Sequence, residues 1–277
     1  MKIINRVSMF FVSSLILLAA FGPALALTNP TMAPGMALMS YSNGSYYSSN
    51  WSGYSVTGST FTSVSGSWVV PAVTGSRFTT AYSAFWTGID GFNSGTVEQT
   101  GTLSAMINGK ATYYAWYEFY PAAMVQLSGT VKPNDVISAS VAYSISGGTF
   151  TATITDQTQQ WTYTTAPTKV SGATESSAEW IAEAPSSSRG VLPLANFGTA
   201  NYGNHYTSVP STCYATTTTG GPTALGAFPT ADIQTITMAT ETYNFHTHSY
   251  TYNPEATPSA LIADYSSVLD SFSVAYA

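Results

Sequence analysis

The sequence predicts an all-β protein that folds as an antiparallel β-sandwich. Short runs rich in Val, Thr, Tyr and Trp alternate between apolar and polar residues with a period of two. Gly, Pro, Asn and Ser interrupt these runs about every eight to twelve residues, and no stretch shows the period of an amphipathic helix. This pattern is typical of two large sheets packed face to face, as in concanavalin-like or jelly-roll proteins.

Residues 1–26 predict a signal peptide. Lys2 and Arg6 precede the apolar run "MFFVSSLILLAAFG", and "ALA" at 24–26 matches a small-residue cleavage site. A single-pass anchor is the alternative, but the run is short and no basic stop-transfer flank follows it. We therefore expect secretion, with no membrane attachment after cleavage.

Residues 27–47 are rich in Pro, Met and Ser without any period, which predicts a flexible leader or short pro-segment. Residues 48–277 show no internal repeat and no linker, so we expect one β-sandwich domain. The stretch "TTTTGGPT" at 216–223 is expected to be a polar loop. The strands of the domain are expected within 48–56, 61–71, 81–90, 112–121, 135–145, 148–156, 160–166, 177–185 and 271–277.

Few residues are charged, only 7%, and the formal net charge is −6. Loss of Lys2 and Arg6 would leave five basic against thirteen acidic residues, or −8. Nucleic-acid binding, which needs basic patches, is therefore not expected. An acidic environment fits better, because acid unfolds proteins mainly by protonating carboxylates that the native state holds ionised.

Cysteine and histidine chemistry is not indicated. Cys213 is the single cysteine and cannot form an intrachain disulfide, so we expect a buried small residue. His246 and His248 could share one face of a strand, but without a third ligand a hydrogen-bonded surface pair is expected rather than a metal site. We predict no metal and no cofactor. Two triplets, at 43–45 and 50–52, match the N-glycosylation pattern.

Acids and amides set among aromatic residues are the remaining candidates for chemistry. They lie in "FWTGIDGFNSGTVEQTG" (85–101), "YYAWYEFYP" (113–121) and "SAEWIAEAP" (177–185), each expected to be a strand. Alternation sends Glu98 and Gln99 to opposite faces. It places Glu179 and Glu183 together with Ile181 on one face. Two alternatives stay open on the residues alone: a carbohydrate-binding module, or a glycoside hydrolase using Glu118 and Glu183.

The ordered blocks "SSNWSGYSV", "GSWVVP", "FWTGIDG", "VEQTG", "YYAWYEFYP", "AEWIAEAP" and "LANFG" over residues 48–198 resemble the glutamic peptidases, the eqolisin or G1 family. The resemblance implies a β-sandwich endopeptidase that is active in acid, acts on protein and peptide substrates, and is a monomer. Its catalytic pair falls on Gln99 and Glu183, and its substrate-cleft residues fall on Trp51, Trp86, Asp90 and Glu118.

The chemistry implied by that pair is reasonable for amide hydrolysis. Glu183 would remove a proton from water and return it to the leaving nitrogen, while Gln99 would orient the water and stabilise the oxyanion. Glu179 would then be structural. Two departures stand out. The leader is short and lacks Lys and Arg, unlike the longer basic pro-segments of fungal members, and Pro185 follows where those members usually carry acidic residues.

Overall fold

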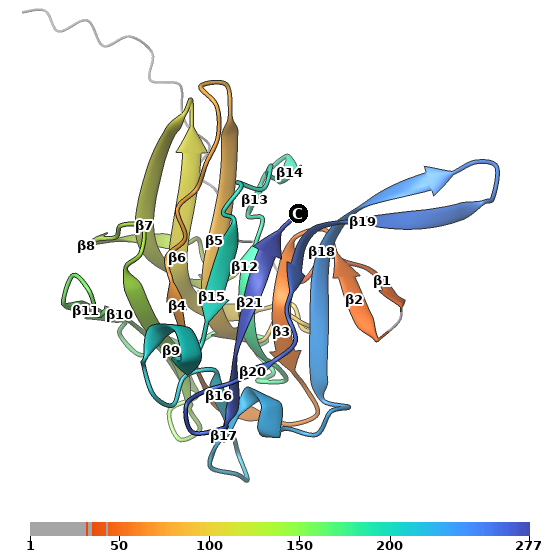
Figure 1. Cartoon of the computed structure of the whole chain (residues 1–277). Coiled ribbons are helices and arrows are strands. Elements are labelled where there is room, and N and C mark those ends of the chain that lie inside the picture. Colours follow the sequence, from red (N-terminus) through yellow and green to blue (C-terminus); the bar gives the residue numbers. More distant parts are fainter. Residues whose placement is uncertain (1–31, 33–34, 43) are drawn as a thin grey trace, which may run out of the picture.

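In the computed structural model, which describes residues 32, 35–42 and 44–277, the chain folds into two stacked β-sheets (Figure 1). The predicted signal peptide lies outside the described residues. Among those that are described, no helix is long and apolar enough to cross a membrane.

The first sheet carries the candidate residues. Its strands follow one another in the order β8, β7, β6, β5, β12, β3, β18, β2 and β1, and all neighbours are antiparallel except β2 and β18. The bounds are β1 Leu38–Ser42, β2 Ser45–Ser48, β3 Trp51–Val56, β5 Thr80–Ile89, β6 Val97–Ile107, β7 Lys110–Tyr120, β8 Val125–Thr130, β12 Ala178–Glu183 and β18 Ile233–Asn244.

The second sheet packs against the first and continues from it through the β18–β19 hairpin. It is centred on β4, which pairs with β9, β15 and β16. Its strands are β4 Phe61–Val69, β9 Val136–Ser144, β10 Thr149–Asp156, β11 Trp161–Thr164, β15 Thr199–Tyr202, β16 Tyr214–Thr217, β17 Pro222–Ala224, β19 Ser249–Pro258, β20 Ile262–Ala263 and β21 Leu269–Tyr276. A separate ribbon of β13 Ser186–Ser187 and β14 Gly190–Val191 follows β12.

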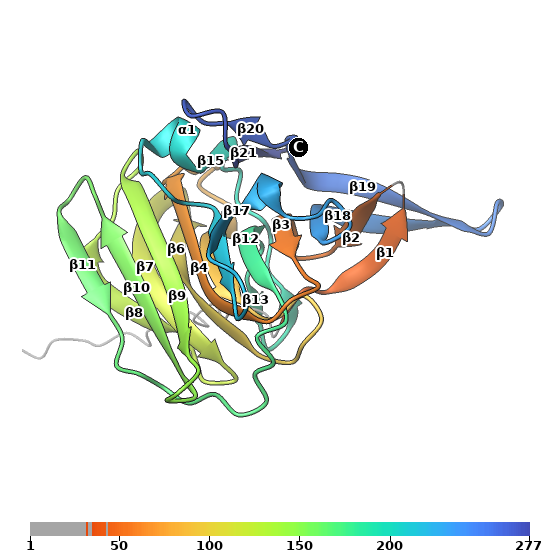
Figure 2. The same cartoon turned by 90° about the horizontal axis from the view of Figure 1, so that it is seen from below.

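Within the described residues, helix is confined to two short pieces, α1 Asn204–Thr207 and the 3₁₀ turn η1 Leu225–Ala227. Figure 2 shows α1 at one edge of the sandwich beside β20 and β21, far from β1 and β2. The all-β sandwich predicted from the period-two pattern is confirmed.

The main core lies between the two sheets. Trp180 and Phe85 from the first sheet pack in one buried cluster with Trp68, Tyr202 and Phe272 from the second. Side-chain hydrogen bonds of core aromatic residues join the layers, among them Trp180 Nε1 to the Ser65 carbonyl (2.8 Å), Trp68 Nε1 to Thr102 Oγ1 (2.9 Å) and Tyr202 Oη to the Ile181 carbonyl (2.6 Å). Large aromatic side chains thus fill the space while their polar atoms stay bonded.

Four expectations about local structure were wrong. Residues 38–42 and 45–47 lie in strands β1 and β2, where a flexible leader was expected. The stretch 85–101 is two strands, because the chain turns between Ile89 and Val97. Residues 216–217 and 222–223 belong to strands β16 and β17, so the expected polar loop is limited to 218–221. His246 and His248 sit in the turn between β18 and β19, not on a strand.

Candidate active site

The outer face of the first sheet, turned away from the second sheet, gathers the candidate residues. In the register, Glu183 lies opposite Trp51 on β3 and Ala84 on β5, while Gln99 on β6 lies opposite Gly88 on β5 and Glu118 on β7. Residues directly opposite in antiparallel strands share a face. The two catalytic candidates therefore project from the same face on either side of β5.

A second buried cluster, here called the outer cluster, covers this face. It contains three tryptophans and is separate from the core between the sheets. Its buried members are Met32, Trp51, Tyr82, Ala84, Trp86, Val97, Leu103, Ala105, Trp116, Ile181 and Ile236. Trp180 and Ala182, which alternate with Ile181 along β12, belong to the inner core instead. The parity expected for β12 is confirmed.

Small residues make room for the tryptophans on this face. A Cβ on Gly101 would lie 2.2 Å from the Phe85 carbonyl oxygen and 2.6 Å from Trp86 Cβ. On Gly88 it would lie 3.0 Å from Gln99 Cβ and 3.1 Å from Trp86 Cζ3. The glycines of "TGID" and "QTG" thus allow Trp86 and Gln99 to pack closely across adjacent strands.

Glu183 is completely buried and is held by a tryptophan. Trp86 Nε1 donates a hydrogen bond of 2.8 Å to Glu183 Oε2, and the rings of Trp86 and Trp51 meet edge to face at 4.9 Å. Because an indole can only donate, this bond favours the ionised form of the carboxyl group.

Gln99 is also completely buried and is bonded to Glu118, a second acid on this face. Its Nε2 donates to Glu118 Oε2 at 3.0 Å, whereas its Oε1 has no hydrogen-bond partner among the described residues. Burial, followed by the negative charge of Glu183, raises the pKa of Glu118 to about 8. Glu118 is therefore neutral in mild acid, and Glu183 can ionise without a charged neighbour in Glu118.

Asp90 is not brought together with the other cleft candidates. It directly follows β5 and has φ 71°, and its carboxylate accepts five hydrogen bonds of 2.8–3.1 Å from the backbone and hydroxyl groups of residues 174–176. This arrangement fixes the segment that leads into β12. Asp90 thereby holds the strand that carries Glu183.

Glu179 shares the face of Glu183 but not its surroundings. Ser55 Oγ donates to Glu179 Oε1 at 3.2 Å, and Oε2 has no partner among the described residues. Burial raises the pKa of Glu179 well above the ordinary value. The two acids of "SAEWIAEAP" thus have different surroundings, one beside an indole donor and one beside a hydroxyl group.

Several lining residues were missed from the sequence. Trp116 could have been found, because it is two residues before Glu118 on β7 and alternation puts both on one face. Ile236 comes from β18, beyond the ordered motif blocks, and Met32 from the leader, so neither carried a sequence signal.

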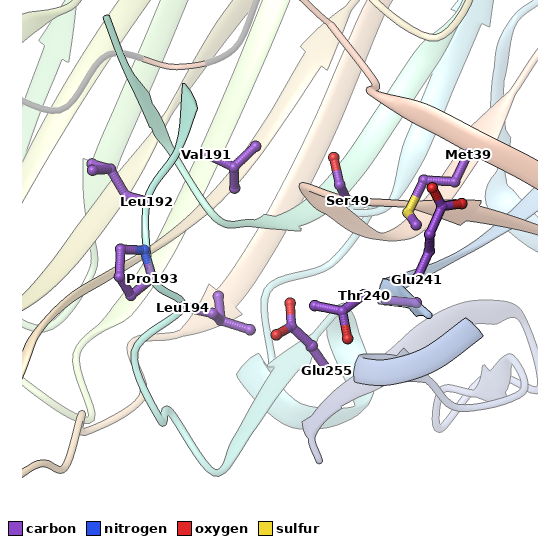
Figure 3. A pocket seen from close by; sticks show the side chains of 10 residues that line it. Met39, Ser49, Val191, Leu192, Pro193, Leu194, Thr240, Glu241 and Glu255 are labelled. Atoms are coloured by element: carbon purple, nitrogen blue, oxygen red, sulfur yellow. The ribbon is translucent and has the colours of Figure 1, made fainter. Parts of the chain in front are cut away.

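A separate cavity of about 530 Å³ lies beside the site, between β1, the segment after Glu183 and the β18–β19 hairpin (Figure 3). Figure 3 shows Glu255 beside Thr240 and Leu194, and Glu241 beside Met39. Neither Gln99 nor Glu183 lines it. Leu192 connects the cavity with the site, because it lines the cavity and also packs against the outer cluster.

The remaining candidates are quickly placed. Cys213 is a free, buried thiol, as expected. His248 Nδ1 is bonded to Tyr243 Oη (3.1 Å) in an exposed turn. Asn50 of the second glycosylation triplet is buried, with its side chain bonded to Ala37 and Gly35, so it is not available to a glycan in this structure. Asn43 of the first triplet lies outside the described residues.

Comparison with known proteins gives a consistent result. The model of the Peptidase A4 family matches residues 49–252. Aspergillopepsin-2 of Aspergillus niger is 30% identical over 202 residues, which cover 64% of this chain and 72% of that protein. Scytalidopepsin B of Scytalidium lignicola is 38% identical over 96 residues, or 34% and 35% of the two chains.

Solved structures agree. Scytalido-glutamic peptidase, crystallised with a peptide-based transition-state analogue, superposes with a TM-score of 0.61 at 25% identity, covering 83% of this chain and 98% of that one. Aspergilloglutamic peptidase from Aspergillus niger superposes with a TM-score of 0.51 at 22% identity over 71% and 99% of the chains, which supports the shared fold.

Proposed function

The chain belongs to the Peptidase A4 family and is a glutamic peptidase, and we propose that it cleaves peptide bonds in acid with Glu183 and Gln99 as its catalytic residues. The observation that carries this proposal is the pair of hydrogen bonds on the outer face, from Trp86 to Glu183 and from Gln99 to Glu118. They hold one ionisable carboxyl group and one amide on the same face beside three buried tryptophans.

The first step is the attack of water on the substrate carbonyl carbon. Glu183, as the carboxylate, takes one proton from the water while the oxygen forms the new bond to carbon. The carbonyl oxygen becomes an oxyanion. Gln99 Oε1 can accept from the attacking water, and the Nε2 hydrogen not bonded to Glu118 can donate to the oxyanion.

The second step returns the proton. As the tetrahedral intermediate collapses, the carbonyl re-forms, the bond between carbon and nitrogen breaks, and the carboxyl group of Glu183 protonates the leaving amine. Because an amide does not titrate, Gln99 works unchanged over the acid range. The lower pH limit is then set by the need for Glu183 to be ionised before the water attacks.

The other residues of the outer face support this pair. Glu118 positions Gln99 by accepting from Nε2, and in its neutral form it adds no charge that would oppose the ionisation of Glu183. Trp51 and Trp86 offer apolar surface to substrate side chains. Asp90 acts at a distance, by fixing residues 174–176 ahead of β12. The N-terminal sequence supports export of the enzyme, which we expect to act as a secreted monomer.

The test is hydrolysis of an unfolded protein near pH 4, with an inhibitor of aspartic peptidases present. We expect Gln99→Ala and Glu183→Gln each to lower kcat by at least about 10²–10³, the range found when an oxyanion donor is removed. Glu179→Gln is the matched control, because it makes the same change four residues away on the same face of β12. Equal losses in Glu179→Gln and Glu183→Gln, or activity retained in Gln99→Ala, would contradict the proposal.

A further inference from the structure

The far half of the β18–β19 hairpin, residues 240–253, is here called the arm. Figures 1 and 2 both show it projecting away from the two sheets. Within the described part of the chain, its strand segments 240–244 and 249–253 pair only with each other. A two-stranded ribbon by itself is marginally stable in water. None of the arm residues is a member of the outer cluster, so the peptidase site does not explain why the arm is there.

One face of the arm carries a row of aromatic rings. Tyr243 and Tyr250 lie directly opposite each other, and Tyr252 lies on the same face because it is two residues from Tyr250. The ring centroid of Tyr243 is 4.9 Å from that of Tyr250 and 5.0 Å from that of Phe245 in the turn. The row continues onto the body, where Tyr252 stacks on Tyr47 of β2 at 4.9 Å.

These rings are exposed and are already held in place. Phe245 is 79% exposed and Tyr250 is 55% exposed. The Tyr243 hydroxyl group is bonded to His248 Nδ1 at 3.1 Å, and its ring contacts neighbours on both sides. The protein therefore loses little conformational entropy when a ligand binds to these rings.

The composition of the arm indicates the chemistry of its ligand. Residues 240–253 contain no Lys or Arg, which disfavours nucleic acid and anionic lipid. They also contain no Leu, Ile, Val or Met, so a purely aliphatic partner would meet no aliphatic side chain of comparable size. What remains is a set of aromatic rings among Thr, Ser and Asn side chains. This combination suits a ligand that is apolar on one face and hydroxylated at its rim.

A sugar ring has that character. Its C–H groups pack on the face of an aromatic ring, while its hydroxyl groups form hydrogen bonds with hydroxyl, amide and carboxylate groups. The cavity at the base of the arm supplies such acceptors, because Glu241 and Glu255 both line it. Stacking surfaces and hydrogen-bond acceptors thus occur together along the arm and at its base.

We propose that the aromatic face of the arm binds a neutral polysaccharide, with Phe245 and Tyr250 packing against its sugar rings. Glu241 and Glu255 accept hydrogen bonds from sugar hydroxyl groups where the chain reaches the cavity. This function is additional to the proposed peptidase activity and needs neither Gln99 nor Glu183. The bound polysaccharide keeps the enzyme close to proteins embedded in the same material.

The test is affinity electrophoresis of the full chain in native gels that contain galactomannan, hydroxyethyl cellulose or glycogen. We expect at least one of these neutral polysaccharides to retard the protein. Phe245→Ala and Tyr250→Ala should each weaken that binding at least about tenfold, as removal of a Tyr or another large side chain from the centre of an interface does. Tyr250→Phe should retain it, because the ring is kept. Retardation by none of the three polysaccharides overturns the proposal.

Matched controls come from the body of the protein. Phe78 is 80% exposed and Tyr265 is 83% exposed, and both lie outside the arm. Phe78→Ala and Tyr265→Ala should leave the retardation unchanged. Thr251→Ala, on the opposite face of the arm, should leave it unchanged as well. Losses in these controls equal to those in Phe245→Ala and Tyr250→Ala overturn the proposal, because binding would then not be specific to the aromatic face.

Three further measurements separate this proposal from other uses of the arm. Retardation by polygalacturonate but by no neutral polysaccharide shows an anionic ligand and overturns it. A dimer in sedimentation velocity that dissociates in Phe245→Ala shows that a second copy covers the face, which also overturns it. For a short peptide substrate, kcat/KM should be the same in Phe245→Ala as in the wild type. A tenfold fall would mean that the arm binds the peptide substrate instead.

Discussion

Glu118 and Glu98 lie on neighbouring strands of one sheet and face opposite sides of it. Glu118 faces outward and accepts a hydrogen bond from Gln99. Glu98 precedes Gln99 in sequence and lies opposite Ile89 and Phe119, which belong to the core between the sheets. Neither oxygen of its side chain has a hydrogen-bond partner among the described residues.

The two acids respond to burial alike. The pKa of Glu118 is raised to about 8 and that of Glu98 to about 9, in both cases chiefly by burial. For Glu98 the negative charge of Asp90 adds to the rise. Burial and a raised pKa therefore do not identify the working acid. Glu118 differs from Glu98 in its contacts with the catalytic candidates: its carboxyl oxygen accepts a hydrogen bond from Gln99, and the charge of Glu183 raises its pKa.

Replacement of Glu98 should give the largest effect, and it should be on stability. The native pKa of Glu98 lies far above the unfolded value of about 4.3, so the native state holds a proton that the unfolded state releases. The stability that Glu98 contributes is fully present below about pH 4.3 and is lost as pH rises towards 9. The slope is at most about 1.4 kcal/mol per pH unit.

Glu98→Leu removes this dependence. We expect its gain in free energy of unfolding over the wild type to be small at pH 4 and to reach on the order of 3 kcal/mol at pH 8. Urea unfolding at both pH values measures it, and kcat should be unchanged. The same gain at both pH values would show that Glu98 does not titrate in this way.

Glu118→Leu makes the same replacement on the other face and should act on catalysis. Without its acceptor, the buried amide of Gln99 loses the hydrogen bond that orients it. We expect kcat to fall about 100-fold, or about 2.7 kcal/mol. Glu118→Gln should recover most of the loss, because its amide oxygen can still accept from Gln99 Nε2. If Glu118→Leu keeps the wild-type kcat, Glu118 does not position Gln99 for catalysis.

Alternation along single strands is what made the site partly predictable. It placed Glu179, Ile181 and Glu183 on one face and separated Glu98 from Gln99, because side chains on a strand alternate whatever the strand pairs with. The ordered motif blocks then distinguished Glu183 from Glu179. Neither of these inferences needed knowledge of how the sheets pack.

What the sequence could not provide is non-local. The residues that satisfy Asp90 lie 84–86 positions further along the chain, so its part in fixing the approach to β12 has no local pattern. The pairing of β2 with β18 joins residues about 190 positions apart. That pairing gives order to a Ser- and Tyr-rich stretch whose composition alone predicted none. The burial of Met32 depends on the same kind of distant contact.

Trp86→Phe sharpens the comparison by changing the surroundings of Glu183 without removing an acid. The ring remains while the donor to Glu183 Oε2 is lost. A hydrogen bond to a charged group contributes about 1.5–3 kcal/mol, so the ionised form loses support. We expect the acid limb of the pH profile of kcat/KM to move to higher pH by about one unit. If the acid limb does not move, the hydrogen bond from Trp86 does not stabilise the ionised form of Glu183.

Ser55→Ala should have the smallest effect, and its size tests the contrast between the two acids of β12. Burial raises the pKa of Glu179 well above the ordinary value, so in mild acid the bond from Ser55 joins two neutral groups. Such a bond contributes only about 1 kcal/mol. We therefore expect Ser55→Ala to lower the free energy of unfolding by about that amount at pH 4, while the pH profile of kcat/KM stays in place.

A shift of that profile as large as the one in Trp86→Phe would mean that Glu179 is coupled to the reaction. Glu179 could then no longer be described as a purely structural acid in contrast to Glu183.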